Sequence, residues 1–324
     1  MSAEACRRAA LAEAADAPSP TPEGVPASNA TWRDLIGYAT RTLGSEREAR
    51  WIVEETAEPP GPVSSARLGR TAPAAAATRV IQLVGRRRAG EPLQHVLGHW
   101  SFRTLEVIVD DRALVPRPET EVVTGVAIGE LDRLVADAGR RGGQPRLNVV
   151  DLGTGSGVIA LSIATERSFA EVTATDRSHA ALDLAAENVG RQPAGVQSRL
   201  SLCCGEWYSA LPSSLNAAVA VIVSNPPYVA RAEWQELDAA VRHDPYEALV
   251  AGETGLESIE AVIGGSARWL SQSGSVVVEI APHQADRACA IAAAVIDPAG
   301  RSLFESVEVL ADLAGRPRVL LART

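Results

Sequence analysis

The second half of the chain alternates between short apolar runs and helical patterns, and this alternation limits the possible folds more than any other feature. Strands that alternate with helices form right-handed βαβ units, so a mainly parallel sheet is expected. Residues 304–310 and 316–321, around Ala314-Gly315, instead predict two strands joined by a tight turn, and therefore an antiparallel edge. The sequence thus indicates an α/β fold built on runs at residues 147–151, 171–176, 198–204, 218–224 and 275–280, separated by helices such as 158–165 and 178–189.

A glycine-rich segment, Asp-Leu-Gly-Thr-Gly-Ser-Gly at residues 151–157, lies where the first run ends and a helix begins. Glycines at such a junction let backbone N–H groups approach a ligand at the positive end of the helix. Asp176 closes the next run, where a carboxylate can accept hydrogen bonds from ribose hydroxyls. Together these features indicate an adenosine-type ligand. Because Gly155, Gly157 and Ala160 also fit the dinucleotide pattern, they do not choose between a nicotinamide dinucleotide and S-adenosylmethionine.

The segment Ser-Asn-Pro-Pro-Tyr at residues 224–228 follows the fourth run and carries more specific chemistry. Two prolines at a strand end cannot donate to the sheet, so the segment should leave the sheet as a stiff turn beside the ligand crevice. The Asn225 side-chain oxygen and the Pro226 carbonyl can both accept from one planar NH2 group, and Tyr228 offers a flat face for stacking. Such a clamp directs the nitrogen lone pair at an incoming methyl group. A nicotinamide enzyme has no use for it, so the motif favours methyl transfer to nitrogen.

The glycine loop and the Asn-Pro-Pro-Tyr segment together resemble class I S-adenosylmethionine-dependent methyltransferases acting on a planar nitrogen. Three more segments narrow the resemblance: Gly-Glu-Pro-Leu-Gln-His-Val-Leu-Gly at 90–98, Pro-Arg-Pro-Glu-Thr-Glu at 116–121, and His-Asp-Pro-Tyr-Glu-Ala-Leu at 243–249. With them, the chain from about Thr31 onward resembles the HemK/PrmC family, which methylates the glutamine in the Gly-Gly-Gln loop of peptide chain release factors. The resemblance implies a Rossmann-like methyltransferase fold, S-adenosyl-L-methionine as cofactor and release factors as protein partners.

The resemblance also implies roles for individual residues. Asp176 would hold the ribose of the cofactor, and Trp207 would lie against its adenine. The full cofactor site would comprise Asp151, Gly153, Thr154, Gly155, Ser156, Gly157, Asp176, Trp207 and Asn225. The glutamine amide would be bound by Asn225, Pro226, Pro227 and Tyr228, with Asn225, Pro226 and Tyr228 as the catalytic residues. No metal site is expected.

Three positions depart from the family pattern. His95 stands where the family usually has Tyr, and Glu206 stands where an Asp commonly precedes the aromatic residue. Residues 253–256 read Glu-Thr-Gly-Leu where Asp-Gly-Leu is usual. None of these changes removes an atom of the expected clamp.

The first third of the chain predicts a separate helical unit. Between residues 31 and 90 apolar side chains recur at helical spacing, with breaks at the Pro-Pro-Gly-Pro of 59–62 and at Pro73. The first thirty residues are rich in Ala and Pro and cannot bury enough apolar area to fold. We therefore expect a flexible tail at 1–30, a helical substrate-recognition domain at 31–100, a linker hairpin at 101–115 and the catalytic domain at 116–324.

Net charge weighs against the main alternative function, an amino-methyltransferase acting on an exocyclic base nitrogen of nucleic acid. All 31 basic residues are Arg, and 40 acidic residues give a net charge of −9. This field would repel a polyanion unless a local basic patch overrode it, so neither direct nucleic-acid binding nor a nucleic-acid substrate is expected. A non-catalytic module that docks on a release factor or ribosome is the other alternative. It would need neither acceptor of the Asn225-Pro226 pair.

The remaining features concern location and a coincidence. The four cysteines form no C-x-x-C pair, which is typical of reduced intracellular thiols, and no apolar run is long enough to span a bilayer. A cytoplasmic protein without membrane contact is therefore expected. Gly142-Gly143-Gln144 copies the tripeptide of the implied substrate. Chance in a loop rich in Arg and Gly is a simpler explanation than self-methylation.

Overall fold

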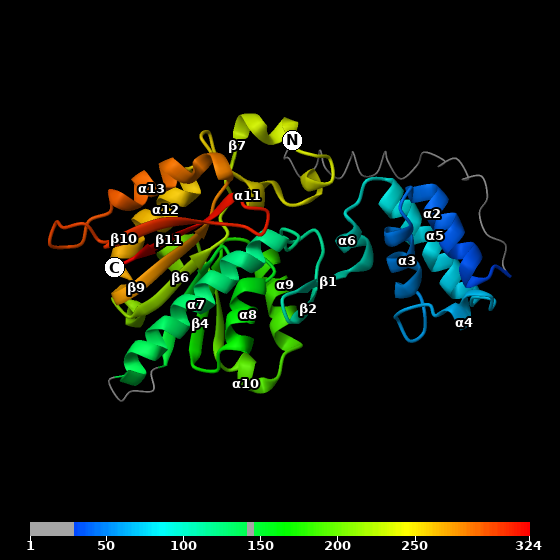
Figure 1. Cartoon of the computed structure of the whole chain (residues 1–324), viewed down its shortest axis with the longest axis horizontal. Coiled ribbons are helices and arrows are strands. Elements are labelled where there is room, and N and C mark those ends of the chain that lie inside the picture. The colour runs from blue at the N-terminus through cyan, green and yellow to red at the C-terminus, as the bar shows by residue number, and fades with distance from the viewer. Residues whose placement is uncertain (1–28, 141–145) are drawn as a thin grey trace. The chain divides into compact units, whose positions relative to one another are not determined.

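The computed structural model describes residues 29–140 and 146–324 (Figure 1). The chain divides into two compact units between Ala89 and Gly90. Two sequence predictions fall outside the described residues: most of the expected tail at 1–30, and the Gly142-Gly143-Gln144 tripeptide.

The first unit is helical, and its helix ends follow from local capping. Thr31 caps the first described helix because its hydroxyl accepts from the N–H of Asp34, while the Asp34 carboxylate accepts from the N–H of Thr31. Arg87, from the basic end of the last helix, bonds Glu48 at 2.7 Å. This contact joins the last helix to the second. The helices are α2 (Trp32–Leu43), α3 (Glu46–Glu55), α4 (Ser65–Leu68) and α5 (Ala74–Arg88).

In the described part of the chain, the second unit is built on a seven-stranded sheet of order β10-β11-β9-β6-β3-β4-β5. Its strands are β3 (Leu147–Leu152), β4 (Ala170–Asp176), β5 (Leu200–Cys204), β6 (Val219–Ser224), β9 (Leu270–Glu279), β10 (Ser306–Ala311) and β11 (Pro317–Arg323). Strands β5, β4, β3, β6 and β9 pair in parallel, and β11 pairs antiparallel with both of its neighbours. The predicted α/β fold with an antiparallel edge is therefore confirmed. Within that edge, the antiparallel strand is β11, one position inside β10.

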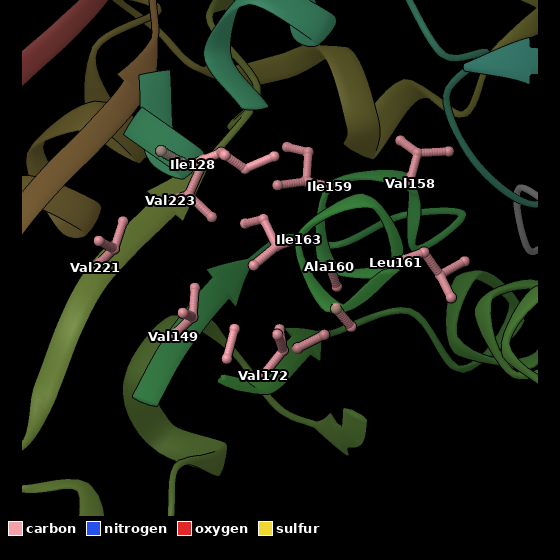
Figure 2. Close-up of a cluster of buried hydrophobic side chains, with 14 of the residues drawn as sticks. Ile128, Val149, Val158, Ile159, Ala160, Leu161, Ile163, Val172, Val221 and Val223 are labelled. Carbon is pink, nitrogen blue, oxygen red and sulfur yellow. The ribbon is translucent and has the colours of Figure 1, made fainter. Parts of the chain in front are cut away.

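Helices cover both faces of this sheet because its inner strands are apolar on both sides. Val149 packs with the helices of one face and Val150 with those of the other, as the alternation of side chains along a strand requires. Figure 2 shows the first of these clusters, in which α8 contributes apolar residues from Val158 to Ile163. One face carries α7 (Pro118–Arg140), α8 (Val158–Glu166), α9 (His179–Gly190) and α10 (Ala194–Gln197), and the other carries α12 (Glu257–Gly264) and α13 (Ala285–Ala293).

Smaller elements complete the second unit. The hairpin of β1 (His99–Phe102) and β2 (Leu105–Ile108) is anchored to α9, since the Asn188 side chain accepts from the N–H of Ile108 and donates to its carbonyl. None of the helices in the described ranges combines the length and the apolar character needed to cross a membrane. The remaining elements are α6 (Leu93–Leu97), β7 (Val229–Ala230), α11 (Tyr246–Leu249), β8 (Val250–Gly252) and the 3-10 turns η1 (Trp207–Ala210), η2 (Ser213–Leu215), η3 (Arg231–Glu236), η4 (Val241–His243), η5 (Ser266–Arg268) and η6 (Pro282–Gln284).

Candidate active site

A cavity of about 700 Å³ opens beyond the carboxyl ends of β3, β4 and β6. The chain order reverses at β3, which has β4 on one side and β6 on the other. Ligands of open α/β sheets bind at such a reversal. Of the predicted residues, those that line this cavity are Gly153, Thr154, Gly155, Ser156, Asp176, Trp207, Asn225 and Pro227.

The glycine loop needs glycine at three positions. Gly153, Gly155 and Gly157 have φ values of 72°, 56° and 85°, a region that other residues enter only with strain. A Cβ atom at Gly157 would lie 3.3 Å from the Cβ of Ala185, so this glycine also lets α9 approach the loop. The N–H groups of Gly153 and Thr154 both donate to the Thr175 carbonyl. The loop is therefore a fixed wall of the cavity.

Asp151 lies behind this wall. Its side chain is fully buried, and its Oδ2 accepts from the Thr154 hydroxyl at 2.6 Å and from the Ala160 N–H at 3.2 Å. Burial raises the pKa of Asp151 to about 7. The contacts of Asp151 fix the loop to the start of α8, and its expected binding of the cofactor stays a prediction.

Asp176 and Trp207 both line the cavity. The two oxygens of Asp176 accept from the N–H groups of Gly155 and Ser178, each at 2.9 Å, and these bonds orient the carboxylate. Trp207 has a φ of 48°, and its carbonyl accepts from the Thr175 hydroxyl. Its ring comes within 3.7 Å of the Cβ position of Gly153. A strained backbone held by neighbouring groups is common at binding sites.

The Asn225 amide is held by Thr120, which also lines the cavity. Its Nδ2 donates to the Thr120 hydroxyl at 3.0 Å, and that hydroxyl donates to Oε2 of Glu279 at 2.8 Å. Among the described residues no group donates to Asn225 Oδ1, so this oxygen is left to accept from a ligand. Pro226 is buried and does not line the cavity.

Tyr228, like Pro226, does not line the cavity. It packs against two apolar clusters. Burial raises the pKa of Tyr228 to about 12, so the phenol stays neutral. Its expected stacking on a substrate amide stays a prediction.

A buried glutamine fixes the chain just after the Asn-Pro-Pro-Tyr segment. The Gln284 amide donates to the carbonyls of Tyr228 and Gly255, at 3.0 and 2.9 Å. Gly255 has a φ of 78°, and a Cβ atom there would lie 2.7 Å from the Tyr228 carbonyl oxygen. Only glycine fits between these two backbone segments.

Gly255→Ala should therefore destabilise the protein by about 1–3 kcal/mol, the usual range for a residue forced into a disfavoured backbone conformation. Gly264→Ala is the matched control, because Gly264 ends α12 and a Cβ atom there meets nothing within 4 Å. Urea unfolding followed by tryptophan fluorescence measures both variants. Equal midpoints for the two would contradict this account of Gly255.

The three segments that narrowed the family resemblance converge on Asp244. One Asp244 oxygen accepts from the N–H of Val115 at 3.1 Å, and the other accepts from Arg117 at 2.5 Å. His95 Nε2 lies 3.9 Å from the first oxygen. Burial raises the pKa of Asp244 and lowers that of His95. The contacts around Asp244 fix the start of α7, which carries Thr120 to the clamp.

Thr120 and Glu279 are functional candidates to which sequence reasoning gave no role. Glu279 interrupts the apolar run Ser-Val-Val-Val-Glu-Ile at the carboxyl end of β9, next to the strand that precedes Asn225. A carboxylate at the end of a buried strand could have been recognised from the sequence as a candidate, because a buried charge requires a hydrogen-bonding or charged partner. Among the described residues, no cluster of His, Cys, Asp and Glu could hold a metal ion.

Comparison with known proteins decides the family. The release factor glutamine methyltransferase of Moorella thermoacetica is 36% identical over 299 residues, covering 90% of this chain and 98% of the relative. Those of Burkholderia pseudomallei and Xylella fastidiosa are 37% and 38% identical, covering 76% and 77% of this chain and 80% and 83% of the relatives. This chain belongs to the release factor glutamine methyltransferase family.

Residues 143–252 also match the model of the methyltransferase small domain. That stretch contains the glycine loop, Asp176, Trp207 and the Asn-Pro-Pro-Tyr segment of this release factor glutamine methyltransferase family member. The predictions of a methyltransferase, of its class I fold and of S-adenosylmethionine as cofactor are confirmed by these matches.

Proposed function

We propose that this chain transfers a methyl group from S-adenosylmethionine to the side-chain amide nitrogen of the glutamine in the Gly-Gly-Gln motif of release factors. The observation that carries the proposal is the orientation of Asn225. Its NH2 group is bound to Thr120, which leaves Oδ1 as an acceptor at the cavity. An acceptor there suits a planar NH2 group. The names of the relatives supply the substrate class.

The described residues fit S-adenosylmethionine. The cavity lies within the usual size range for ligand sites, and Gly153 and Gly155, which line it, have φ values of 72° and 56° that favour glycine. Asp176 would bind the ribose hydroxyls and Trp207 would lie against the adenine. When bound, the cofactor supplies an activated methyl group on a sulfonium.

The protein residues would contribute orientation and charge rather than a strong base. An amide nitrogen is a weak nucleophile because its lone pair is delocalised, so it must be held with that lone pair toward the methyl group. Asn225 Oδ1 and the Pro226 carbonyl would each accept one of its N–H groups. As the nitrogen loses electron density, these N–H groups become more acidic and both hydrogen bonds strengthen. Such bonds stabilise the transition state more than the bound substrate.

Transfer of label from S-adenosylmethionine in a cytosolic extract tests this function. The proposal expects the label in protein of release-factor size, and loss of that signal when the glutamine of the Gly-Gly-Gln motif is replaced by alanine. Label recovered in nucleic acid would support the alternative of a base amino-methyltransferase. The net charge of −9 favours the protein substrate. Because release factors act on ribosomes, a cytoplasmic location is part of the proposal.

We also propose that the helical first unit recognises the release factor, while the second unit carries the chemistry. A chain beginning at Gly90, where the units divide, should then bind S-adenosylmethionine with unchanged affinity. Its kcat/KM on a folded release factor should fall by at least ~10-fold, which corresponds to about 1.4 kcal/mol of lost contacts. A short Gly-Gly-Gln peptide is the control substrate, because it should be methylated equally by both chains. Equal rates on the folded release factor would exclude this division of roles.

A further inference from the structure

Three residues from distant parts of the chain form a line of hydrogen bonds in the wall of the cavity, and two of them, Asn225 and Thr120, line it. Asn225 follows β6, Thr120 lies in the first turn of α7, and Glu279 ends β9. Strands β6 and β9 pair in parallel with Ser224 beside Val278, which places Asn225 and Glu279 next to each other at the carboxyl edge. Thr120 is 3% exposed and Glu279 is 1% exposed. Both side chains are therefore almost closed to bulk solvent.

The chemistry of these groups gives the line a direction. A carboxylate can only accept hydrogen bonds, so the single hydroxyl hydrogen of Thr120 is committed to Glu279. The Thr120 oxygen can then only accept from Asn225, and only the NH2 end of the Asn225 amide can donate. Rotating the amide by half a turn would place two acceptors against each other. The carboxylate thus determines which end of Asn225 faces the cavity.

We propose that Thr120 and Glu279 are positioning residues that hold Asn225 with its oxygen toward the substrate nitrogen. The proposal rests on the proposed function, in which Asn225 Oδ1 accepts an N–H bond from glutamine. Neither Thr120 nor Glu279 needs to take or give a proton in the reaction. Their contribution is to prevent the amide from presenting its NH2 end to another NH2 group.

The ionised form of Glu279 is required for this direction. A protonated carboxyl can donate to the Thr120 oxygen, which frees the Thr120 hydrogen to bond Asn225 Oδ1 and compete with the substrate. Burial raises the pKa of Glu279 to about 7. The rate of methyl transfer should therefore fall as the pH falls through about 7.

The charged and titratable groups around Glu279 come from three directions. Arg318 on β11 and Arg117 before α7 favour its ionised form, and Glu119 at the start of α7 opposes it. The Tyr228 phenol lies close enough to Glu279 for the carboxylate charge to raise the pKa of Tyr228. Burial holds the pKa of Tyr228 at about 12, so of these two groups it is Glu279 that titrates near neutrality.

Substitution at Thr120 separates the hydrogen bond from the shape of the side chain. Thr120→Val keeps the shape and loses the hydroxyl, so single-turnover methyl transfer should slow by roughly 10–100-fold, as for a misplaced reacting group. The Kd for S-adenosylmethionine, measured by calorimetry, should be unchanged. Thr120→Ser keeps the hydroxyl and should restore most of the rate.

Thr124→Val is the matched control, because the buried Thr124 hydroxyl one turn along α7 donates only to the Thr120 carbonyl. Thr124→Val should leave the rate within about twofold of the wild type. It removes only one neutral hydrogen bond and leaves those of Asn225, Thr120 and Glu279 in place. Glu279→Gln removes the titration, so its rate should no longer fall with pH near 7. A Thr120→Val rate equal to that of wild type would overturn the proposal.

A spectroscopic measurement on the full chain without cofactor provides a second readout. The Asn225 side-chain NH2 signal can be observed after 15N labelling of asparagine and identified by its loss in Asn225→Ala. In the wild type this signal should shift with pH as Glu279 titrates, and the shift should disappear in Glu279→Gln. A wild-type signal that does not move between pH 5 and 9, or that moves equally in Glu279→Gln, would overturn the proposal even if Thr120→Val failed to fold.

The outcomes distinguish this proposal from the function on which it rests. If Asn225→Ala abolishes methylation while Thr120→Val is fully active, the positioning role fails and the proposed function stands. If Asn225→Ala methylates glutamine at the wild-type rate, the proposed function fails. In that case the NMR titration still shows whether Glu279 controls the Asn225 amide.

Discussion

Asn225→Ala should lower the single-turnover rate of glutamine methylation by roughly 10²–10³, the loss typical of removing one preorganised transition-state partner. The Asn225 amide is fixed by its hydrogen bond to Thr120, so its oxygen needs no reorganisation when the substrate nitrogen binds. Alanine would remove the acceptor and leave Thr120 Oγ1 without its donor. The affinity for S-adenosylmethionine should change little, because Asp176, Trp207 and the glycine loop are untouched. Single-turnover rates separate this effect from a binding defect.

Asn225→Asp is an informative companion to that variant. It keeps an oxygen toward the cavity but replaces the NH2 donor with a second acceptor against Thr120, whose only hydrogen is committed to Glu279. It also places a negative charge beside a buried carboxylate, which is unfavourable. We therefore expect a slow variant whose rate rises as one of the two carboxyl groups becomes protonated at lower pH. Wild-type rates for Asn225→Ala would refute the clamp.

Asp176→Ala should weaken S-adenosylmethionine binding by about 1.5–3 kcal/mol, the usual worth of hydrogen bonds to a charged group. The carboxylate also accepts from the N–H groups of Gly155 and Ser178, so its loss would loosen the loop that forms the cavity wall. Calorimetric titration measures the affinity. Asp176→Asn should lose less affinity for S-adenosylmethionine, since it keeps one acceptor oxygen. NAD should give no heat of binding with any form of the protein. An unchanged Kd for Asp176→Ala would remove this residue from the ribose site.

Much of the sheet could be predicted because buried parallel strands are nearly continuous apolar runs. The runs predicted at 147–151 and 171–176 correspond to β3 and β4, and the observed strand ends lie within one residue of the predicted ones. Strand β9 was predicted to begin at Ser275, but it begins at Leu270. The prediction missed its first residues because they include the exposed Gln272 and Ser273 and also Gly274. Residues 271–274 lie at an irregularity in the pairing with β6, and no apolar pattern marks them.

The site was predictable where one short segment carries the whole chemistry. The glycine loop, Asp176 and Asn225 are such cases, since each follows a strand and meets the cavity at its carboxyl end. Asp151 differs from these residues because it does not line the cavity. A carboxylate at the head of a glycine loop suggests ligand binding, but the burial of its side chain depends on the packing of α8 and could not be read locally.

The line of bonds through Thr120 and Glu279 could not be predicted for a different reason. The two residues are 159 positions apart, and their contact depends on the register of β6 against β9 and on where α7 begins. Pro118 in the first turn, with Glu119 and Glu121 at the positive end of the dipole, explains where α7 begins. That explanation holds for the helix, but Thr120 between the two glutamates also belongs to the site.

Tandem mass spectrometry of a purified release factor, after incubation with this chain and S-adenosylmethionine, tests the central claim most directly. The account predicts a mass gain of one methyl group on the side chain of the glutamine in the Gly-Gly-Gln peptide, and no gain with Asn225→Ala on the same time scale. An unmodified glutamine in that peptide, with the methyl group found on another residue or on nucleic acid, would contradict it.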